Sequence, residues 1–254
     1  MKWSYNLVSK YLSYFHRKSD ITLTPSQDQK REMKKIGIDN VAILGHGVNT
    51  RLFSPLKKSY EIREGWGAKP DSKVFLYVGR VSMEKNLDFL FECYLKVAAD
   101  SNSLVITGDG PYLKELIKKY PFAHFSGRCE REKLAQIYAS ADVFIFPSET
   151  ETFGNVILEA MASGLVVVAY RYDAAKTNII NGVNGFTVPV GDEQKFSEAM
   201  GLCVTHDLGR NARKQALSQR WGSVYRKFER TGEAVLLARR AKEHERTQQI
   251  TLFS

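Results

Sequence analysis

The fold is decided by one stretch of the sequence, VFLYVGRVSMEKNLDFLFECYLKVAADSNSLVITGDG, which occupies residues 74–110. Residues 74–78 and 104–107 are short, apolar and rich in β-branched residues, as buried strands are. Between these runs, apolar side chains recur at steps of three and four residues and predict a connecting helix: Leu87, Leu90, Phe91, Tyr94, Leu95 and Ala98. Two strands joined by a helix in this way are the unit of a parallel sheet.

The same alternation continues on the carboxyl-terminal side of this unit. Four further apolar runs occupy residues 124–126, 143–146, 166–169 and 186–188. We therefore predict an α/β fold, with a Rossmann-like, doubly wound parallel sheet over residues 59–205. Residues 206–254 contain no strand-like run, and apolar side chains recur at helical spacing from Trp221 to Phe228, which predicts a helical tail.

The amino-terminal segment, residues 1–58, is organised differently. Residues 1–19 are helix-like and rich in aromatic side chains, residues 20–24 resemble a strand, and a second helix is expected from Pro25 to near Gly37. This segment is too short to bury its own aromatic faces as a separate domain. We expect it to be the remnant of a larger amino-terminal domain, followed by the connector to the sheet domain.

The composition is that of an ordinary globular protein. Hydrophobic residues make up 43% of the 254 residues and charged residues 26%, which excludes wholesale disorder. No apolar run is long enough to span a membrane, and the first residues lack the apolar core of a secretory signal, so we expect a cytoplasmic chain. The three cysteines are odd in number and far apart, which argues against a disulfide framework or a structural zinc site.

The positive charge is concentrated near the carboxyl end. The net charge of the chain is +9, and residues 210–254 hold eleven basic and four acidic side chains, a net of +7. Such a segment is either a solvated helix face or a site for an anionic surface. An anionic membrane is the better functional option. Nucleic acid is not expected as a partner, because aromatic residues do not interleave with the basic ones.

Candidate ligand-binding residues follow the predicted strands, because ligands of open parallel sheets bind at the carboxyl ends of the strands. Gly79, Arg80 and Lys85 follow the first run, Gly108 follows the second, and Arg128 follows the third. Glycines let a ligand approach the backbone closely, and two cations beside a helix start suit an anionic group such as a phosphate. The alternative is that Arg80 and Lys85 are solvated surface cations.

Two glutamates, Glu151 and Glu159, form a second candidate site after the fourth strand-like run. Each carboxylate can accept hydrogen bonds from vicinal hydroxyls, as a sugar or a ribose presents them. The backbone N–H groups of Phe153, Gly154 and Asn155 lie at a helix start, where an anion is favoured. The alternative is that the glutamates form structural salt bridges.

Other kinds of site are excluded more clearly. The GDGP motif at residues 108–111 lacks the third glycine of a dinucleotide fingerprint, and no phosphate-binding loop with the pattern Gly-x4-Gly-Lys is present. No Asp-x-Asp pair occurs, and the five histidines show no ligand spacing. We therefore predict no metal and no cofactor.

Several longer strings carry a family resemblance. They are GHGVNTRLFSP (45–55), LYVGRVSMEKNLD (76–88), ITGDGP (106–111), FSGRCEREKLAQIYASADVFIFPSETETFGNVILEAMASG (125–164) and NGVNGFTVPVGD (181–192). These strings resemble the nucleotide-sugar-binding half of the retaining glycosyltransferases of family 4, which have the GT-B fold. Within that family the sequence looks like the branch of GDP-mannose-dependent α-mannosyltransferases and sulfoquinovosyl transferases.

The resemblance implies a role for each candidate residue. Arg80 and Lys85 match the cations that hold the donor diphosphate, and Glu151 matches the carboxylate that contacts the transferred sugar. These three are the expected catalytic residues. Glu159 matches the carboxylate that binds the ribose. The remaining donor-binding matches are Gly79, Gly108, Arg128, which by its position borders the nucleobase, and the amides of Phe153, Gly154 and Asn155.

The resemblance also implies the reaction. A family member of this kind is an enzyme that transfers a hexose from GDP-mannose or a UDP-sugar to an acceptor such as a lipid or a glycan. The anomeric configuration is retained and no metal takes part, because fixed cations and a helix start meet the charge of the leaving diphosphate. The sequence does not name the base, the sugar or the acceptor.

Two departures from the family pattern limit what is carried over. Where many members have a Gly-Gly pair and a glutamate, this chain reads DAAKT at residues 173–177. A complete GT-B enzyme has two Rossmann-like domains, and this chain has room for one. We therefore expect a truncated enzyme, or a donor-binding chain completed by a separately encoded acceptor-domain partner, at the inner face of the membrane. The alternative is a non-catalytic module that binds a nucleotide sugar or a membrane surface.

Overall fold

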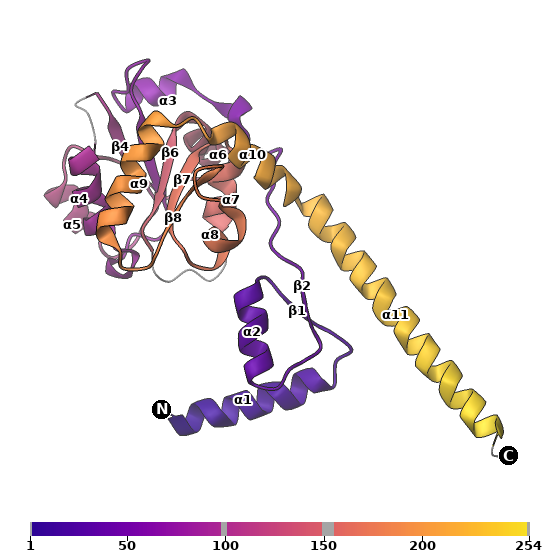
Figure 1. Ribbon diagram of the computed structural model, residues 1–254. Coiled ribbons are helices and arrows are strands. Elements are labelled where there is room, and N and C mark those ends of the chain that lie inside the picture. Colours follow the sequence, from indigo (N-terminus) through magenta and orange to yellow (C-terminus); the bar gives the residue numbers. More distant parts are fainter. Residues whose placement is uncertain (1, 98–100, 149–154, 253–254) are drawn as a thin grey trace. The chain divides into compact units, whose positions relative to one another are not determined.

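The computed structural model describes residues 2–97, 101–148 and 155–252 (Figure 1). Of residues 2–6, 173, 246 and 248–252 only the backbone is described. Contacts between Cα atoms divide the chain into two compact units. The larger unit is Val48–Arg220, and the smaller unit combines Met1–Gly47 with Trp221–Ser254. The domain boundaries expected after residues 58 and 205 stay a prediction.

The larger unit is built around a six-stranded parallel sheet with the strand order β5-β4-β3-β6-β7-β8. Its strands are β3 (Val74–Val78), β4 (Ser103–Thr107), β5 (His124–Gly127), β6 (Val143–Phe146), β7 (Val166–Tyr170) and β8 (Gly185–Val188). The chain adds strands outward from β3 on one side and outward from β6 on the other. This reversal confirms the doubly wound, Rossmann-like sheet predicted from the sequence. In such sheets, ligands bind beyond the carboxyl ends of the two strands between which the direction reverses.

Helices lie on both faces of this sheet (Figure 1). The α-helices of the unit are α3 (Tyr60–Gly65), α4 (Leu87–Val97), α5 (Leu113–Lys119), α6 (Arg131–Ser140), α7 (Asn155–Ala162), α8 (Asp173–Asn178), α9 (Glu193–Thr205) and α10 (Gly209–Ser218). Two short 3-10 helices are η1 (Pro55–Lys57) and η2 (Met83–Lys85). The crossovers through α4 and α7 run in opposite directions along the sheet. Because such crossovers are right-handed, these two helices cover opposite faces.

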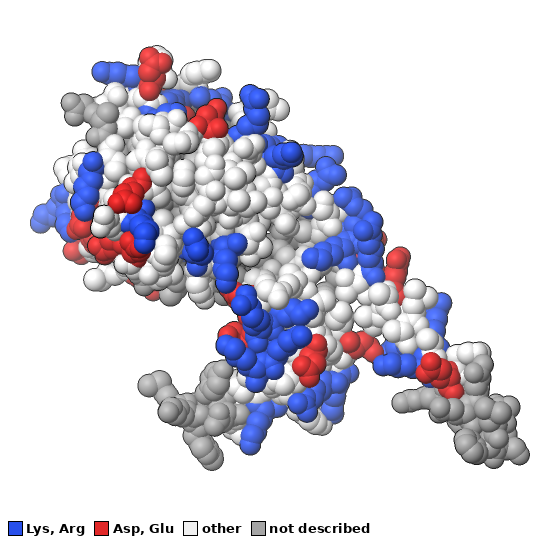
Figure 2. All heavy atoms as spheres, in the orientation of Figure 1, with Lys and Arg blue, Asp and Glu red and all other residues white. Residues whose placement is uncertain are grey.

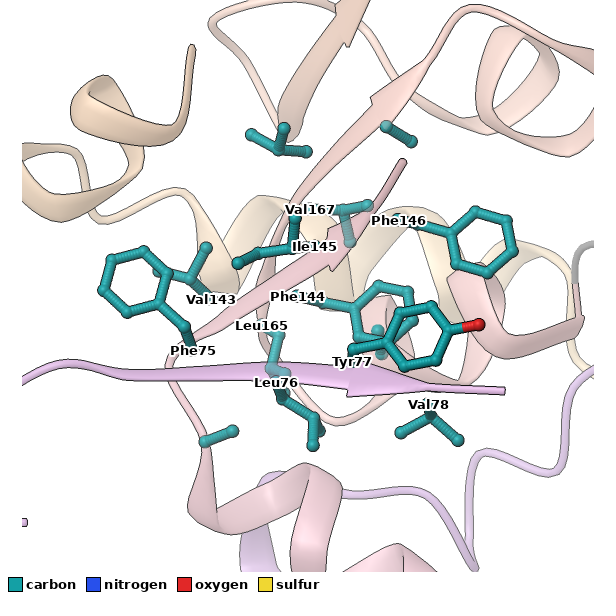
Figure 3. Close-up of a cluster of buried hydrophobic side chains, with 14 of the residues drawn as sticks. Phe75, Leu76, Tyr77, Val78, Val143, Phe144, Ile145, Phe146, Leu165 and Val167 are labelled. Carbon is teal, nitrogen blue, oxygen red and sulfur yellow. The ribbon is translucent and has the colours of Figure 1, made fainter. Parts of the chain in front are cut away.

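The central strands are buried on both faces, which explains why they read as continuous apolar runs. Every residue of β3, β4, β6 and β7 is buried. Aromatic rings fill the space beside β3 and β6 (Figure 3): Phe144 and Phe146 stack with their ring centroids 6.0 Å apart, and Tyr77 stacks on Phe146 at 6.2 Å. The loops that leave the carboxyl ends of β3 and β6 therefore start from fixed points.

An ion pair between buried Arg63 and partly buried Asp142 lies at the amino end of the same sheet. Nη1 of Arg63 lies 2.8 Å from Oδ2 of Asp142, and the guanidinium also donates to the carbonyl oxygens of Ser140 (2.8 Å) and Ser72 (2.9 Å). The Asp142 carboxylate accepts a further hydrogen bond from the Val74 amide at 2.8 Å. The buried Arg63 and the partly buried Asp142 thus each have several partners, which an ion pair withdrawn from water needs if it is to stabilise a fold.

The smaller unit contains the elements expected at the amino end and the long helix of the tail. They are α1 (Lys2–Arg17), β1 (Thr22–Thr24), α2 (Gln27–Lys35), β2 (Val41–Ile43) and α11 (Trp221–Leu252). The strands β1 and β2 pair in parallel. The Ser26 hydroxyl caps α2 by accepting a hydrogen bond from the Gln29 amide at 3.2 Å. The helical tail predicted for residues 206–254 is confirmed as helical and consists of α10, which belongs to the larger unit, and α11.

The apolar face of α1 is exposed within the smaller unit. This agrees with the expectation that the amino-terminal segment is too short to bury its own aromatic faces. Five of its apolar or aromatic side chains are more than half exposed: Leu7, Val8, Tyr11, Tyr14 and Phe15. Within the described residues, no helix is both long enough and apolar enough to cross a lipid bilayer.

Candidate functional site

The loop after β3 carries the first predicted cation, Arg80. Its guanidinium lies 3.9 Å from the Glu84 carboxylate, and both side chains are more than half exposed, at 66% and 58%. An ion pair of that length and exposure contributes little to stability. The Arg80 side chain is therefore exposed and only weakly paired among the described residues, and its role in binding a ligand stays a prediction.

Backbone hydrogen bonds join the loops that follow β3, β4 and β5. The Gly79 amide donates to the Thr107 carbonyl at 3.0 Å, and the Val81 amide donates to the Asp109 carbonyl at 2.9 Å. The Gly108 amide in turn donates to the Gly127 carbonyl at 2.9 Å. These hydrogen bonds join the backbone of the three loops into one continuous layer along the carboxyl edge of the sheet, which we call the ledge. Gly79 and Gly108 are neighbours in it.

Gly108 is required by this close approach of two loops. Its φ is +141°, a conformation that side chains rarely adopt, and a Cβ there would lie 1.8 Å from the Gly79 carbonyl oxygen. Gly110 is similarly restricted, because its Cβ would lie 2.1 Å from the Val81 carbonyl oxygen. The glycines of the GDGP motif therefore serve the packing of the ledge, whether or not a ligand lies above it.

The second predicted cation, Lys85, is the last residue of η2. It spans the gap between β3 and β6, the two strands between which the strand order reverses. Its Nζ donates to the Ser148 hydroxyl at 3.2 Å, and Ser148 lies two residues beyond β6. The contact joins the loop after β3 to the loop after β6. The sequence placed Lys85 at this edge, but it gave no sign that Ser148, 63 residues away, would be its neighbour.

Glu159 lies on α7 and is largely buried against α6. Burial raises the pKa of its carboxyl to about 7, while the approach of Tyr138 and the charge of Arg131 act in the opposite direction. Burial also raises the pKa of the Tyr138 hydroxyl, and the Glu159 carboxyl adds to that rise. The Tyr138 hydroxyl itself has no hydrogen-bond partner among the described residues. Burial is therefore the main influence on the pKa of Glu159. The sequence did not single out Tyr138, since its spacing on α6 is that of an ordinary core residue.

The remaining predicted residues are placed as follows. Arg128 follows β5 and lines a shallow hollow with Cys129, Glu130 and Arg131, and no described contact joins it to Arg80 or Lys85. Asn155 is the first residue of α7 and is exposed. The other three predicted residues of this loop, Glu151, Phe153 and Gly154, lie outside the described residues.

The described residues show no group of three or more His, Cys, Asp or Glu side chains that could hold a metal ion. The expectation that the chain uses neither metal nor cofactor stays a prediction. What the described geometry offers is two cations and a glycine ledge at the carboxyl edge of a doubly wound sheet. This defines a Rossmann-like protein whose two candidate cations lie at the edge where ligands of such sheets bind.

The family of the chain follows from comparison with known families. The model of the family described as "Glycosyl transferases group 1" matches residues 72–206, more than half of the chain. The chain belongs to this family of sugar-transferring enzymes. The family resemblance drawn from the sequence is thereby confirmed.

Curated relatives agree with this assignment. A GDP-mannose-dependent alpha-mannosyltransferase of Corynebacterium glutamicum is 32% identical over 216 residues, which cover 85% of this chain and 51% of the relative. The sulfoquinovosyl transferase SQD2 of Arabidopsis thaliana is 31% identical over 259 residues, covering 95% of this chain and 50% of the relative. The chain thus spans about half the length of these curated relatives.

Solved structures confirm the fold. HepE of Anabaena, solved in complex with UDP, superposes with a TM-score of 0.78 at 23% identity, over 92% of this chain and 68% of that one. Sucrose-phosphate synthase of Thermosynechococcus elongatus superposes with a TM-score of 0.75 at 21% identity, over 89% of this chain and 61% of that one. Both structures share the arrangement of strands and helices described above.

Proposed function

We propose that this chain holds the nucleotide-sugar donor, GDP- or UDP-linked, for the transfer of a hexose. The observation that carries the proposal is the position of Arg80 and Lys85. Both lie on the loop after the central strand β3, and the Lys85 contact with Ser148 marks the point where the strand order reverses. A diphosphate is the part of a nucleotide sugar that two cations on one loop suit.

Each side chain has a distinct part in this proposal. Arg80 forks two hydrogen bonds to phosphate oxygens, and Lys85 adds a mobile point charge from the start of the next helix. Together they meet the negative charge that grows on the diphosphate as the bond to the sugar breaks. Glu151 contacts the transferred sugar, and Glu159 accepts hydrogen bonds from the ribose.

The other donor contacts in this proposal come from backbone and flanking groups. The amides of Phe153, Gly154 and Asn155 contact phosphate, and Arg128 borders the nucleobase. We further propose that transfer retains the anomeric configuration and requires no metal. The curated relatives include enzymes named for GDP-mannose, and HepE was solved with UDP, so both kinds of donor are tested below.

Transfer also requires an acceptor held in line with the donor, and an open half-site leaves that acceptor unpositioned. The chain spans only about half the length of these relatives. We propose that a second, acceptor-binding half completes the site, on the same or on a separate polypeptide, and that the acceptor is a lipid or a glycan. The relatives are named as transferases, which favours an enzyme over a non-catalytic module.

Contact with an anionic membrane surface at the inner face is a second part of the proposal. Figure 2 shows Lys and Arg side chains widely distributed over the face that it draws. The sequence of the helix α11 includes Arg226, Lys227, Arg230, Arg239 and Arg240. Each basic residue near an anionic leaflet contributes about 1 kcal/mol. Co-sedimentation with phosphatidylserine-containing vesicles should be clear at low salt and fade at high salt. Equal binding to uncharged vesicles would contradict an electrostatic attachment.

Calorimetry with GDP, UDP and ADP tests the donor site. At least one nucleotide should bind with millimolar affinity or better. The variant Arg80→Ala should weaken that binding by about tenfold or more, because a hydrogen-bonded charge is lost. The matched control is Arg31→Ala, which removes an exposed arginine paired with Asp28 on the smaller unit and should leave the affinity unchanged. No binding, or the same affinity in Arg80→Ala, would overturn the proposal.

A further inference from the structure

The phenol of Tyr77 reaches from the core into the turn that carries Arg80. Tyr77 lies on β3, is fully buried, and stacks on Phe146 with the two rings nearly parallel, at 11°. Figure 3 shows its ring beside Phe144 and Phe146, with the hydroxyl oxygen projecting toward the carboxyl end of the strand. That hydroxyl donates a hydrogen bond to the carbonyl oxygen of Arg80 at 3.0 Å. Because the ring is packed in this way, its hydroxyl donates to the turn from a fixed position.

The turn is shaped to receive this hydroxyl. Gly79 lies between the strand and Arg80, and a Cβ at Gly79 would come within 2.7 Å of the Tyr77 oxygen. A glycine at this position therefore leaves room for the phenol to pass beneath the backbone. The carbonyl of Arg80 turns toward the core in this arrangement, while its side chain is 66% exposed.

The neighbours of Arg80 are held from a different direction. The amides of Gly79 and Val81 donate to the carbonyl oxygens of Thr107 and Asp109, in the loop after β4. The phenol thus adds a third anchor, from below, to a turn that the adjacent loop already holds from the side. With its backbone fixed at all three residues, the long Arg80 side chain starts from one defined position.

We propose that Tyr77 is a positioning residue for donor binding, which acts by fixing the backbone of Arg80 through its hydroxyl. The inference rests on the proposed function, in which Arg80 grips the donor diphosphate. A mobile turn must be ordered when ligand binds, and that ordering reduces affinity. A turn ordered in advance by Tyr77 avoids this cost.

The chain offers a matched control in Tyr94. Its hydroxyl likewise donates to a backbone carbonyl, that of Asn102, at 2.9 Å, and its ring packs edge-on against Phe75. It is also buried, at 6% exposure. Asn102 directly precedes β4, so this hydrogen bond lies at the amino edge of the sheet, away from Arg80. Tyr77→Phe and Tyr94→Phe therefore remove the same chemistry from opposite edges of one sheet.

The experiment compares these two variants with Arg80→Ala and with the double variant Tyr77→Phe/Arg80→Ala. Calorimetry with GDP and UDP gives the affinity, and amide hydrogen exchange at Val81 reports the order of the turn without any ligand. We expect both phenylalanine variants to lose similar thermal stability. Only Tyr77→Phe should weaken nucleotide binding, by about three- to tenfold, and speed exchange at Val81. In the Arg80→Ala background the same change should have no further effect on affinity.

The outcomes separate this inference from the function on which it rests. If Arg80→Ala binds as tightly as the parent, the proposed function fails, and this inference fails with it. If Arg80→Ala binds weakly but Tyr77→Phe binds like Tyr94→Phe, the donor site stands and the role of Tyr77 is overturned. An equal loss from Tyr77→Phe with and without Arg80 would also overturn it, because the phenol would then act independently of Arg80.

Discussion

The amino edge of the six-stranded sheet is the side where its parallel strands begin, and the carboxyl edge is the side where they end. Charged side chains are paired in opposite ways at these two edges. At the amino edge, Arg63 and Asp142 are 2.8 Å apart, and their side chains are only 7% and 24% exposed. Carbonyl groups and an amide complete their hydrogen bonds. At the carboxyl edge, Arg80 and Glu84 are 3.9 Å apart and largely exposed. The backbone of that edge is nevertheless fixed by the hydrogen bonds between loops.

This difference separates charges that stabilise the fold from charges that are exposed to solvent. At the amino edge, Arg63 and Asp142 form an ion pair that stabilises the fold. At the carboxyl edge, the backbone around Arg80 is held by hydrogen bonds, while its side chain is exposed and forms only a long ion pair with Glu84 among the described residues. No strong internal ion pair of Arg80 would have to break before its guanidinium met a ligand, and removing this side chain should leave the fold intact. The following variants test the comparison.

The largest loss of stability is expected from Arg63→Met. The change leaves the Asp142 carboxylate partly buried without its cation, and breaking a buried pair in this way costs about 3–5 kcal/mol. Chemical unfolding followed by circular dichroism measures the loss. The double variant Arg63→Met/Asp142→Leu should recover part of it, because no unpaired charge remains. A loss below about 1 kcal/mol for the single variant would show that the amino edge is no better paired than the surface.

Gly108→Ala should be the next most damaging change, because it attacks the backbone of the carboxyl edge. The added Cβ would meet the Gly79 carbonyl oxygen at 1.8 Å, so the two loops must separate. We expect a loss of about 2–4 kcal/mol from strain and overpacking together. The control is Gly67→Ala, where φ is +67° but nothing lies within 4 Å of the added Cβ. If both variants melt alike, the loops do not depend on their close contact.

Glu159→Gln should change the pH dependence of stability and should stabilise the protein at high pH. The folded pKa is raised to about 7 from an ordinary value of 4.5, so the folded state keeps a proton that the unfolded state has lost. Stability therefore falls as pH rises from 4.5 to 7, by about 3 kcal/mol at most. Glutamine removes this fall, and the variant should overtake the parent above pH 7.

Melting curves from pH 5 to pH 8 check this prediction. The control is Glu132→Gln, since that carboxylate is 76% exposed and pairs with Lys57 on the surface. A parent and a Glu159→Gln variant whose melting temperatures stay parallel across this range would show that the carboxyl is not buried as the structure has it.

The smallest effect on stability is expected from Arg80→Ala. Its ion pair with Glu84 is long and exposed, so the free energy of unfolding should change by less than about 0.5 kcal/mol. The comparison is sharpest when the same sample is used for nucleotide binding, where the loss should be large. A strongly destabilised Arg80→Ala would place Arg80 with the structural charges of the amino edge.

The fold could be predicted from the sequence because each buried strand is a continuous apolar run and each covering helix keeps its own spacing. Local patterns of this kind need no knowledge of distant partners. The ion pair between Arg63 and Asp142 could not be predicted, since its members are 79 residues apart and meet only when the sheet is assembled.

The candidate site was predictable in part for the same reason. The edge at which Arg80 and Lys85 lie follows from the strand pattern and the rule for open sheets. The partners that fix them do not. Tyr77 appears in the sequence as one more apolar strand residue, and only the path of the turn after Gly79 determines where its hydroxyl points. The predicted roles of Glu151, Phe153 and Gly154 fall outside the described residues and stay predictions.

The amide ledge along β3, β4 and β5 has a consequence for how enzymes of this kind can diversify. Inserting or deleting a residue in any one of these loops would shift every donor and acceptor after it, and the adjoining loop would lose its partners. Changes of length should therefore be tolerated poorly in these three connections.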